Sequence, residues 1–178
     1  MTSTRYRIFD GPEPYFLTCT VVAWIPVFTR SETASILLDS WRFLQEQKRL
    51  TLYGYVILEN HVHWIASGPD LSKEVGDFKS FTARKVLDHL ESRGVQTLLD
   101  QLRWFRKRYR SDRPYQFWAD NNTPKQIQSA EMMFQKLEYI DLNPVKRGFI
   151  DEPTHWRWSS ARNYAGLPAL LPVTTNWQ

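Results

Sequence analysis

Two apolar runs separated by only two residues restrict the fold of this chain more than any other feature. Residues 50–58 (LTLYGYVIL) and 61–67 (HVHWIAS) are rich in aromatic and β-branched side chains, which is typical of strands. Because only Glu59 and Asn60 lie between them, the chain must reverse direction at once. The spacing therefore predicts an antiparallel hairpin in the middle of the chain.

Strand-like and helix-like segments alternate around this hairpin. The expected elements are a strand at 15–25, a helix at 31–48, the hairpin, a helix at 71–90, a short strand at 115–119 and a helix at 129–142. Asn143–Pro144 is expected to end or bend the last helix, because a residue before proline avoids α geometry. The order predicts an α+β ferredoxin-like sandwich, a central antiparallel sheet with helices packed on one face.

The composition limits the class of protein. With 178 residues, 42% of them hydrophobic, the chain can bury a core as one domain. It has no run of 18 apolar residues and no secretory pattern, so we expect a cytosolic protein without a membrane partner. The single cysteine, Cys19, cannot form an internal disulfide and is expected to be buried. A formal charge of +4 suits a polyanionic partner but does not require one.

Two histidines lie one residue apart in the second strand of the hairpin. Side chains alternate between faces along a strand, so His61 and His63 point to one side and Val62 to the other. Two imidazoles on one side can hold a metal ion, although surface or structural histidines show the same spacing. The pattern alone leaves both interpretations open.

Tyr139 and Asn143 are four residues apart in the last predicted helix and project from the same side. An apolar stripe that includes Leu137 and Ile140 would seat this helix on the sheet. A phenol and an amide oxygen would then stand together over the surface that the helix covers. The same pattern also fits a tyrosine at the edge of the core and an asparagine suited to a helix end.

Residues 97–113 are the most basic part of the chain. Four cations are spaced as one face of a helix, namely Arg103, Arg106, Lys107 and Arg110. The opposite side would be buried through Leu98, Leu102, Phe105 and Tyr109. Such a charged face is either only solvated or follows the phosphates of a nucleic acid.

Three blocks in a fixed order resemble the single-tyrosine HUH transposases, and most closely the REP-associated tyrosine transposases. Residues 59–64 (ENHVHW) resemble the family's histidine–hydrophobe–histidine strand. Residues 139–148 (YIDLNPVKRG) resemble its tyrosine helix, and residues 156–164 (WRWSSARNY) resemble its tail signature. The similarity covers residues 6 to 166, and the basic segment is longer than the usual link in the family.

The resemblance implies a role for each matching residue. His61, His63 and Asn143 would bind a divalent metal, Mg²⁺ or Mn²⁺, and Tyr139 would attack a phosphodiester to form a 5′-phosphotyrosine. The partner would be single-stranded or hairpin DNA, in contact with Arg103, Arg106, Lys107, Arg110 and Lys136. Residues 1–150 would form the catalytic domain, with 151–178 as an extension packed on it. A monomer is favoured over a homodimer, because the tail offers no clear dimerisation helix.

Three activities fit this set of residues. The first is metal-dependent cleavage and strand transfer of DNA, and the second is a domesticated relative that holds nucleic-acid hairpins without cutting them. The third is a metallohydrolase that uses water, which would leave Tyr139 without a role. The presence of both histidines, the tyrosine and the asparagine favours the first.

Overall fold

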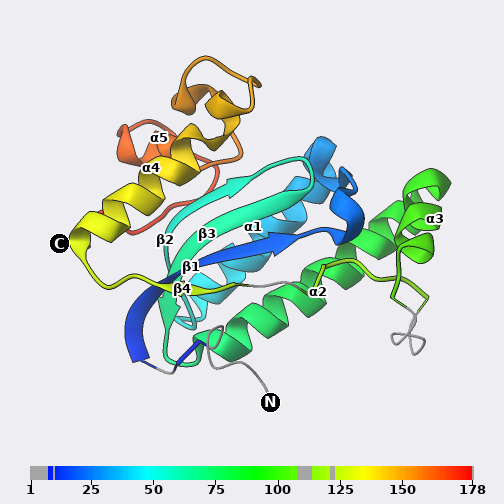
Figure 1. Cartoon of the computed structure of the whole chain (residues 1–178), viewed down its shortest axis with the longest axis horizontal. Helices are drawn as coiled ribbons and strands as arrows, with labels where there is room; N and C mark the ends of the chain where they lie inside the picture. The colour runs from blue at the N-terminus through cyan, green and yellow to red at the C-terminus, as the bar shows by residue number, and fades with distance from the viewer. Residues whose placement is uncertain (1–7, 10, 108–113, 121–122, 178) are drawn as a thin grey trace.

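A four-stranded antiparallel sheet forms the centre of the protein in the computed structural model, which describes residues 8–9, 11–107, 114–120 and 123–177 (Figure 1). The strands are β1 (Gly11–Thr20), β2 (Thr51–Ile57), β3 (His61–Gly68) and β4 (Lys125–Gln126). Their spatial order is β2-β3-β1-β4, and each neighbouring pair is antiparallel. With one helix between β1 and β2 and two between β3 and β4, this confirms the predicted ferredoxin-like α+β fold.

The predicted hairpin is formed by β2 and β3, where the Leu58 N–H donates to the His61 carbonyl at 2.9 Å. The first strand begins and ends earlier than expected. β1 ends at Thr20, and the 3₁₀ turns η2 (Val22–Trp24) and η3 (Val27–Thr29) follow it. Residues 115–119 contribute one isolated bridge, and β4 is the edge strand instead.

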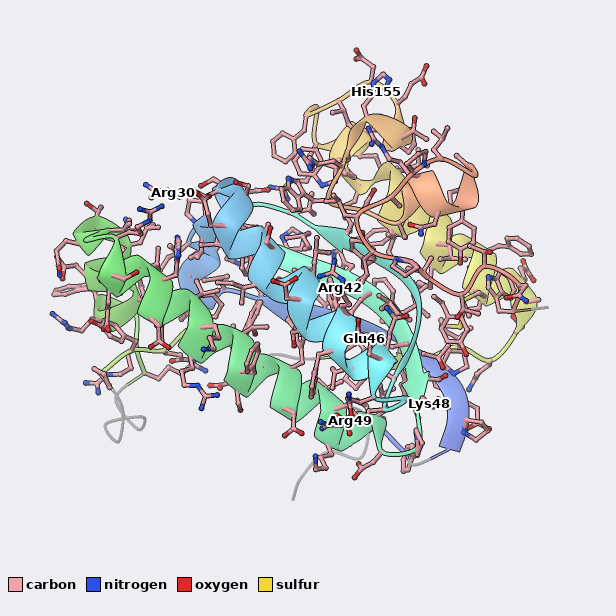
Figure 2. All side chains as sticks on the ribbon, turned by 180° about the vertical axis from the view of Figure 1, so that it is seen from behind. Arg30, Arg42, Glu46, Lys48, Arg49 and His155 are labelled. Carbon is pink, nitrogen blue, oxygen red and sulfur yellow. The ribbon has the colours of Figure 1, made fainter. Side chains whose placement is uncertain are left out.

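Two helices cover one face of the sheet. They are α1 (Ser31–Glu46) and α2 (Leu71–Ser92), and Figure 2 shows both lying across the sheet when the molecule is seen from behind. Trp41 stacks on Phe78 between them with ring centroids 5.1 Å apart, and Trp64 of β3 packs on both rings. Cys19 is buried on this side, as expected. This face holds the larger of two hydrophobic cores.

The opposite face is covered by α4 (Ala130–Lys146), which corrects the expectation that the helices lie on one face. Its apolar stripe, with Leu137 and Ile140, packs on Ile65 of β3. β2 and β3 are therefore buried on both sides, and uninterrupted apolar runs are typical of such strands. The run at residues 50–58 is the sequence signal of this second layer.

α4 does not end at Asn143–Pro144, which was one of the two outcomes predicted there. The helix continues for two residues with Pro144 buried inside its last turn. A proline this close to the end removes one hydrogen bond, while the Arg147 N–H still donates to the Asn143 carbonyl at 3.1 Å. Gly148, with φ of 74°, then takes the left-handed conformation that commonly follows a helix end.

The basic segment at residues 97–113 is not one helix. α3 (Gln96–Trp104) ends early, and Phe105, predicted to be buried, is exposed. The chain turns here because the returning segment binds the helix end, where the Gln116 N–H donates to the Leu102 carbonyl at 3.3 Å. None of the helices in the described ranges is long and apolar enough to cross a membrane.

The C-terminal segment covers the free edge of β2. It contains η5 (Pro153–His155) and α5 (Ala161–Tyr164). Its side chains hydrogen-bond to the backbone of three alternate residues of the strand. Nε1 of Trp156 donates to the Ile57 carbonyl at 3.0 Å, and the Tyr164 hydroxyl donates to the Tyr53 carbonyl at 2.7 Å. Between them, Oγ of Ser160 accepts from the Tyr55 N–H at 3.0 Å. Open strand edges invite pairing with other chains, so this tail closes an aggregation-prone edge.

Candidate functional site

His61 and His63 lie together on the face of the sheet that α4 covers. Their ring centroids are 4.9 Å apart with the planes at 79°, and their residues are 4% and 6% exposed. Val62 and Trp64 point to the opposite core, as the alternation along β3 predicts. The strand therefore brings two imidazoles to one point at the rim of the α4 layer.

Neighbouring side chains fix the orientation of both rings. Nδ1 of His61 lies 2.7 Å from Oδ1 of Asn60, and Nδ1 of His63 lies 2.8 Å from Oγ1 of Thr18, its cross-strand partner on β1. When Nδ1 donates its proton to these oxygens, the lone pair is on Nε2. Partners of this kind are typical of histidines that bind metals, because they select the tautomer and the ring orientation.

Both imidazoles are held in the neutral form. Burial lowers the pKa of His61 to about 4, with the positive charge of Arg147 as the second cause. Burial also lowers the pKa of His63 to about 3, assisted by His61, Lys136 and Arg147. At neutral pH each ring thus keeps the lone pair that a metal ligand requires.

Tyr139 extends from α4 over this pair. Its ring centroid is 5.2 Å from that of His63 and 5.8 Å from that of Phe16, both in edge-to-face geometry. The residue is 41% exposed, so the tyrosine is not a core residue. A substrate that enters from solvent and binds at the histidine pair would therefore lie next to the phenol of Tyr139.

Two cations flank the site. Lys136, one turn before Tyr139, places Nζ 5.0 Å from the Phe16 centroid and 5.9 Å from the Tyr139 centroid. Burial lowers the pKa of Lys136, and the nearby charge of Lys125 lowers it further. Arg147, at the end of α4, forms an ion pair with Glu59 beside the hairpin turn. The arrangement suits an anionic substrate.

Asn143 lies one turn beyond Tyr139 on α4 and is buried. Its side chain makes no hydrogen bond within the described part of the chain, so its amide oxygen is available to a ligand. Among the described residues, no group of three His, Cys, Asp or Glu side chains is placed to hold a metal ion. A third protein ligand beside the two histidines would therefore be of another type, such as this amide.

Comparisons with known proteins identify the architecture. No protein-family model and no curated protein matches the sequence. Among solved structures, that of a REP-associated tyrosine transposase bound to a REP hairpin superposes with a TM-score of 0.65 at 16% identity, covering 99% of this chain and 92% of that chain. The chain has the fold of a REP-associated tyrosine transposase. A crystal structure of a protein assigned as a transposase from Deinococcus radiodurans R1 aligns with a TM-score of 0.44 at 18% identity, over 79% of this chain and 95% of that chain.

The predicted DNA-binding cations do not gather at one place on this transposase fold. Lys136 lies at the tyrosine, whereas α3 lies beside one end of α2, away from α4 (Figure 1). Arg103 contacts Asp100 at 3.6 Å, and Lys107 contacts Asp120 at 3.0 Å. Arg106 follows the end of α3, so it does not share a helical face with Arg103, and Arg110 lies outside the described residues.

Five residues around the site were not among those predicted to form it. Asn60 precedes His61, and Arg147 follows Asn143 by four residues, so both lie inside the blocks that resemble the family. These positions were their only signal in the sequence. Glu59, which fits a solvent-facing turn, is instead the partner of Arg147. Thr18 and Trp24 are brought to the site by strand register and by a turn, which no local pattern encodes.

Proposed function

We propose that this protein is a tyrosine nuclease and strand transferase of single-stranded or hairpin DNA, a transposase of the REP-associated type. The observation that carries the proposal is the position of Tyr139 on α4, with its ring 5.2 Å from His63 and therefore beside the His61–His63 pair. These residues come from segments more than 70 positions apart, and the fold brings them together. The shared fold with a REP-associated tyrosine transposase supports the same reaction class.

The donor set fits a divalent metal. Nε2 of His61, Nε2 of His63 and the amide oxygen of Asn143 would hold Mg²⁺ or Mn²⁺, and an imidazole–amide set suits Mn²⁺ by its ligand preference. Once bound, such an ion neutralises charge on the non-bridging phosphate oxygens. Thr18 and Asn60 keep the two rings in the orientation that this binding needs.

The chain's own residues then account for the covalent step. The positive charge of Lys136 lies 5.9 Å from the ring centroid of Tyr139, beside the residue whose oxygen attacks. The phenolate oxygen attacks phosphorus, the bond from phosphorus to the 3′ oxygen breaks, and that oxygen takes a proton. The phenol proton passes to water. The products are a 5′-phosphotyrosine and a free 3′-hydroxyl. The strand can be rejoined because the new phosphotyrosine bond keeps the energy of the broken phosphodiester bond.

The proposed substrate follows from charge and from the structural neighbour. Lys136, Lys125 and Arg147 place positive charge on two sides of the tyrosine, which suits a polynucleotide backbone. The neighbour was solved bound to a REP hairpin. Hairpin DNA with a single-stranded extension is therefore the substrate to test first.

The test is covalent capture of DNA. We expect purified protein, incubated with a labelled hairpin and Mn²⁺ or Mg²⁺, to form an adduct that survives a denaturing gel. Tyr139→Phe should abolish the adduct. His63→Ala removes a proposed metal ligand and should reduce the adduct by about 100-fold or more, because even changes beside a ligand weaken metal sites by up to that factor. Tyr115→Phe, which removes a phenolic hydroxyl bound by Arg103, is the matched control and should leave the adduct unchanged.

Other outcomes identify the alternatives. If the Tyr139→Phe variant still cuts the DNA, the protein is a hydrolase that uses water. If the wild-type protein binds the hairpin and never cuts it, the protein is a binding module. Either result contradicts the proposal.

A further inference from the structure

An exposed tryptophan stands beside the histidine pair and has no role in the reaction described above. Trp24 is 57% exposed, and its ring centroid lies 5.3 Å from that of His61 with the planes at 72°. Trp41 and Trp64, by contrast, are fully buried. Burial is the usual structural reason for a tryptophan, and it does not explain this one.

The backbone that presents Trp24 is strained. Ala23 and Trp24 have φ of 51° and 58°, so two consecutive residues other than glycine adopt the left-handed conformation. This conformation costs on the order of 1 kcal/mol or more for each such residue, and it persists only where the surroundings impose it. Strain of this kind is typical of functional sites.

The surroundings that impose it are buried and hydrogen-bonded. Val22 and Ile25 anchor the two ends of the turn in the core, and the Val22 N–H donates to the Phe117 carbonyl at 2.8 Å. The Trp24 N–H donates to the Val21 carbonyl at 3.0 Å. The backbone of the turn is therefore fixed at both ends, and the indole that it carries contacts the His61 ring.

One side chain connects this turn to the histidine pair. Nδ2 of Asn60 donates to the Trp24 carbonyl at 3.2 Å, and Oδ1 of the same amide contacts Nδ1 of His61 at 2.7 Å. Asn60 is itself buried. Asn60 thus links the turn that carries the indole to the imidazole of His61.

The chemistry of this location points to a nucleobase. A solvent-exposed indole on a fixed turn offers a flat π surface, and stacking on such surfaces is the usual way in which proteins hold unpaired bases. The same site carries the positive charges of Lys136 and Arg147, which suit the phosphate of the same nucleotide. A protein partner would require a wider apolar surface.

We propose that Trp24 is the stacking platform for an unpaired nucleobase next to the phosphate at His61 and His63. This inference rests on the proposed function and adds a binding subsite to it. Asn60 is a positioning residue, because it acts on the base and the phosphate only through Trp24 and His61. The single-stranded part of the substrate then enters the site along the turn of residues 22–25.

The test measures binding without cleavage, in the Tyr139→Phe background. Fluorescence anisotropy gives the Kd for a labelled hairpin with a single-stranded extension. We expect Trp24→Ala to weaken binding about 5- to 100-fold, the range of one lost base stack. Trp24→Phe should keep most of the affinity, whereas Trp24→Leu, apolar but without a π face, should lose it. Phe43→Ala, which removes an exposed ring from α1 on the far side of the sheet, should change nothing.

Oligonucleotides with a single abasic position locate the stacked base. One position should weaken binding to the same extent as Trp24→Ala, and combining that position with Trp24→Ala should add no further loss. Additive losses at every position, or a Kd of Trp24→Ala within twofold of its parent, would overturn the inference. Thermal melting of each variant checks that the fold is intact.

The inference and the proposed function fail separately. If the wild-type protein captures DNA covalently while Trp24→Ala binds normally, only the stacking platform is lost. If no adduct forms, the anisotropy series still decides whether Trp24 holds a base.

Discussion

A histidine binds a metal well only when its tautomer and ring orientation are set, and in this protein two polar side chains set them. Thr18 and Asn60 each contact an Nδ1 atom, one from the neighbouring strand and one from the residue just before. Burial at the same time keeps both rings neutral. Thr18 and Asn60 therefore decide whether the His61–His63 pair can bind the metal that we propose.

A largely buried carboxyl on α4 gives a prediction about pH. Burial raises the pKa of Asp141 from 3.8 to about 7, and its Oδ1 has no hydrogen-bond partner in the described structure. Because the folded-state pKa lies above the unfolded-state value, the folded protein holds this proton more tightly. The resulting stabilisation is fully present below about pH 4 and is lost as the pH rises to about 7.

Asp141→Asn removes this titration without changing the size of the side chain. Going from pH 5 to pH 8, we expect the wild-type protein to lose about 2 kcal/mol of stability relative to the variant. Urea unfolding of both proteins across this range measures the difference. Parallel stability curves would show that the carboxyl is not held in its protonated form.

At the scale of elements, the site depends on how closely α4 approaches the sheet. A Cβ at Gly54 of β2 would lie 2.6 Å from Cδ2 of Leu137 and 3.3 Å from Oγ of Ser160. Leu137 is two residues before Tyr139 on α4, so this contact limits how closely the helix that carries the tyrosine can approach the sheet. Close helix–strand approach is a common reason for glycine in a strand.

Gly54→Ala is expected to destabilise the protein by about 1–3 kcal/mol, because the added methyl overpacks a closed contact. Gly76→Ala is the matched control, since nothing lies within 4 Å of that position in α2. There the change should stabilise the helix by up to about 1 kcal/mol. Chemical denaturation of both variants measures the two effects, and a neutral Gly54→Ala would contradict the close packing.

The elements with a clear local pattern were predictable from sequence, and the others were not. The hairpin, α1 and α2 lie where composition and spacing place them, and the turn of two residues fixes the register of His61 and His63. The prediction of one helix over residues 97–113 was wrong, because the spacing of charges does not show that Gln116 binds the end of α3. The position of Trp24 depends on backbone strain that tertiary contacts impose.

At the scale of the whole molecule, the sheet is closed on its faces and on one edge. Helices cover both faces, and the tail hydrogen-bonds along β2 through side chains more than 95 positions away in sequence. The local sequence pattern of the tail could not predict these contacts, because nothing in that pattern indicates which strand the tail binds. The tail signature was visible only through its resemblance to a family.

Tyr164→Phe tests the role of the tail. The Tyr164 hydroxyl donates to the Tyr53 carbonyl at 2.7 Å and accepts from Nε1 of Trp177 at 3.2 Å. Its removal leaves a partly buried carbonyl without this donor, so a loss of about 1–2 kcal/mol is expected in urea unfolding. Tyr115→Phe again serves as a control, with a change under about 0.5 kcal/mol, as for surface substitutions. Equal effects of the two changes would rule out a specific role of the tail contact.

The chemical identity of the protein–DNA linkage tests the central claim most directly. After reaction with hairpin DNA and Mn²⁺, the protein is digested with trypsin and nuclease, and the peptide of residues 137–146 is measured by mass spectrometry. The account predicts a nucleotide joined through its 5′-phosphate to the oxygen of Tyr139. Cleaved DNA with a free 5′ end and an unmodified peptide would contradict it.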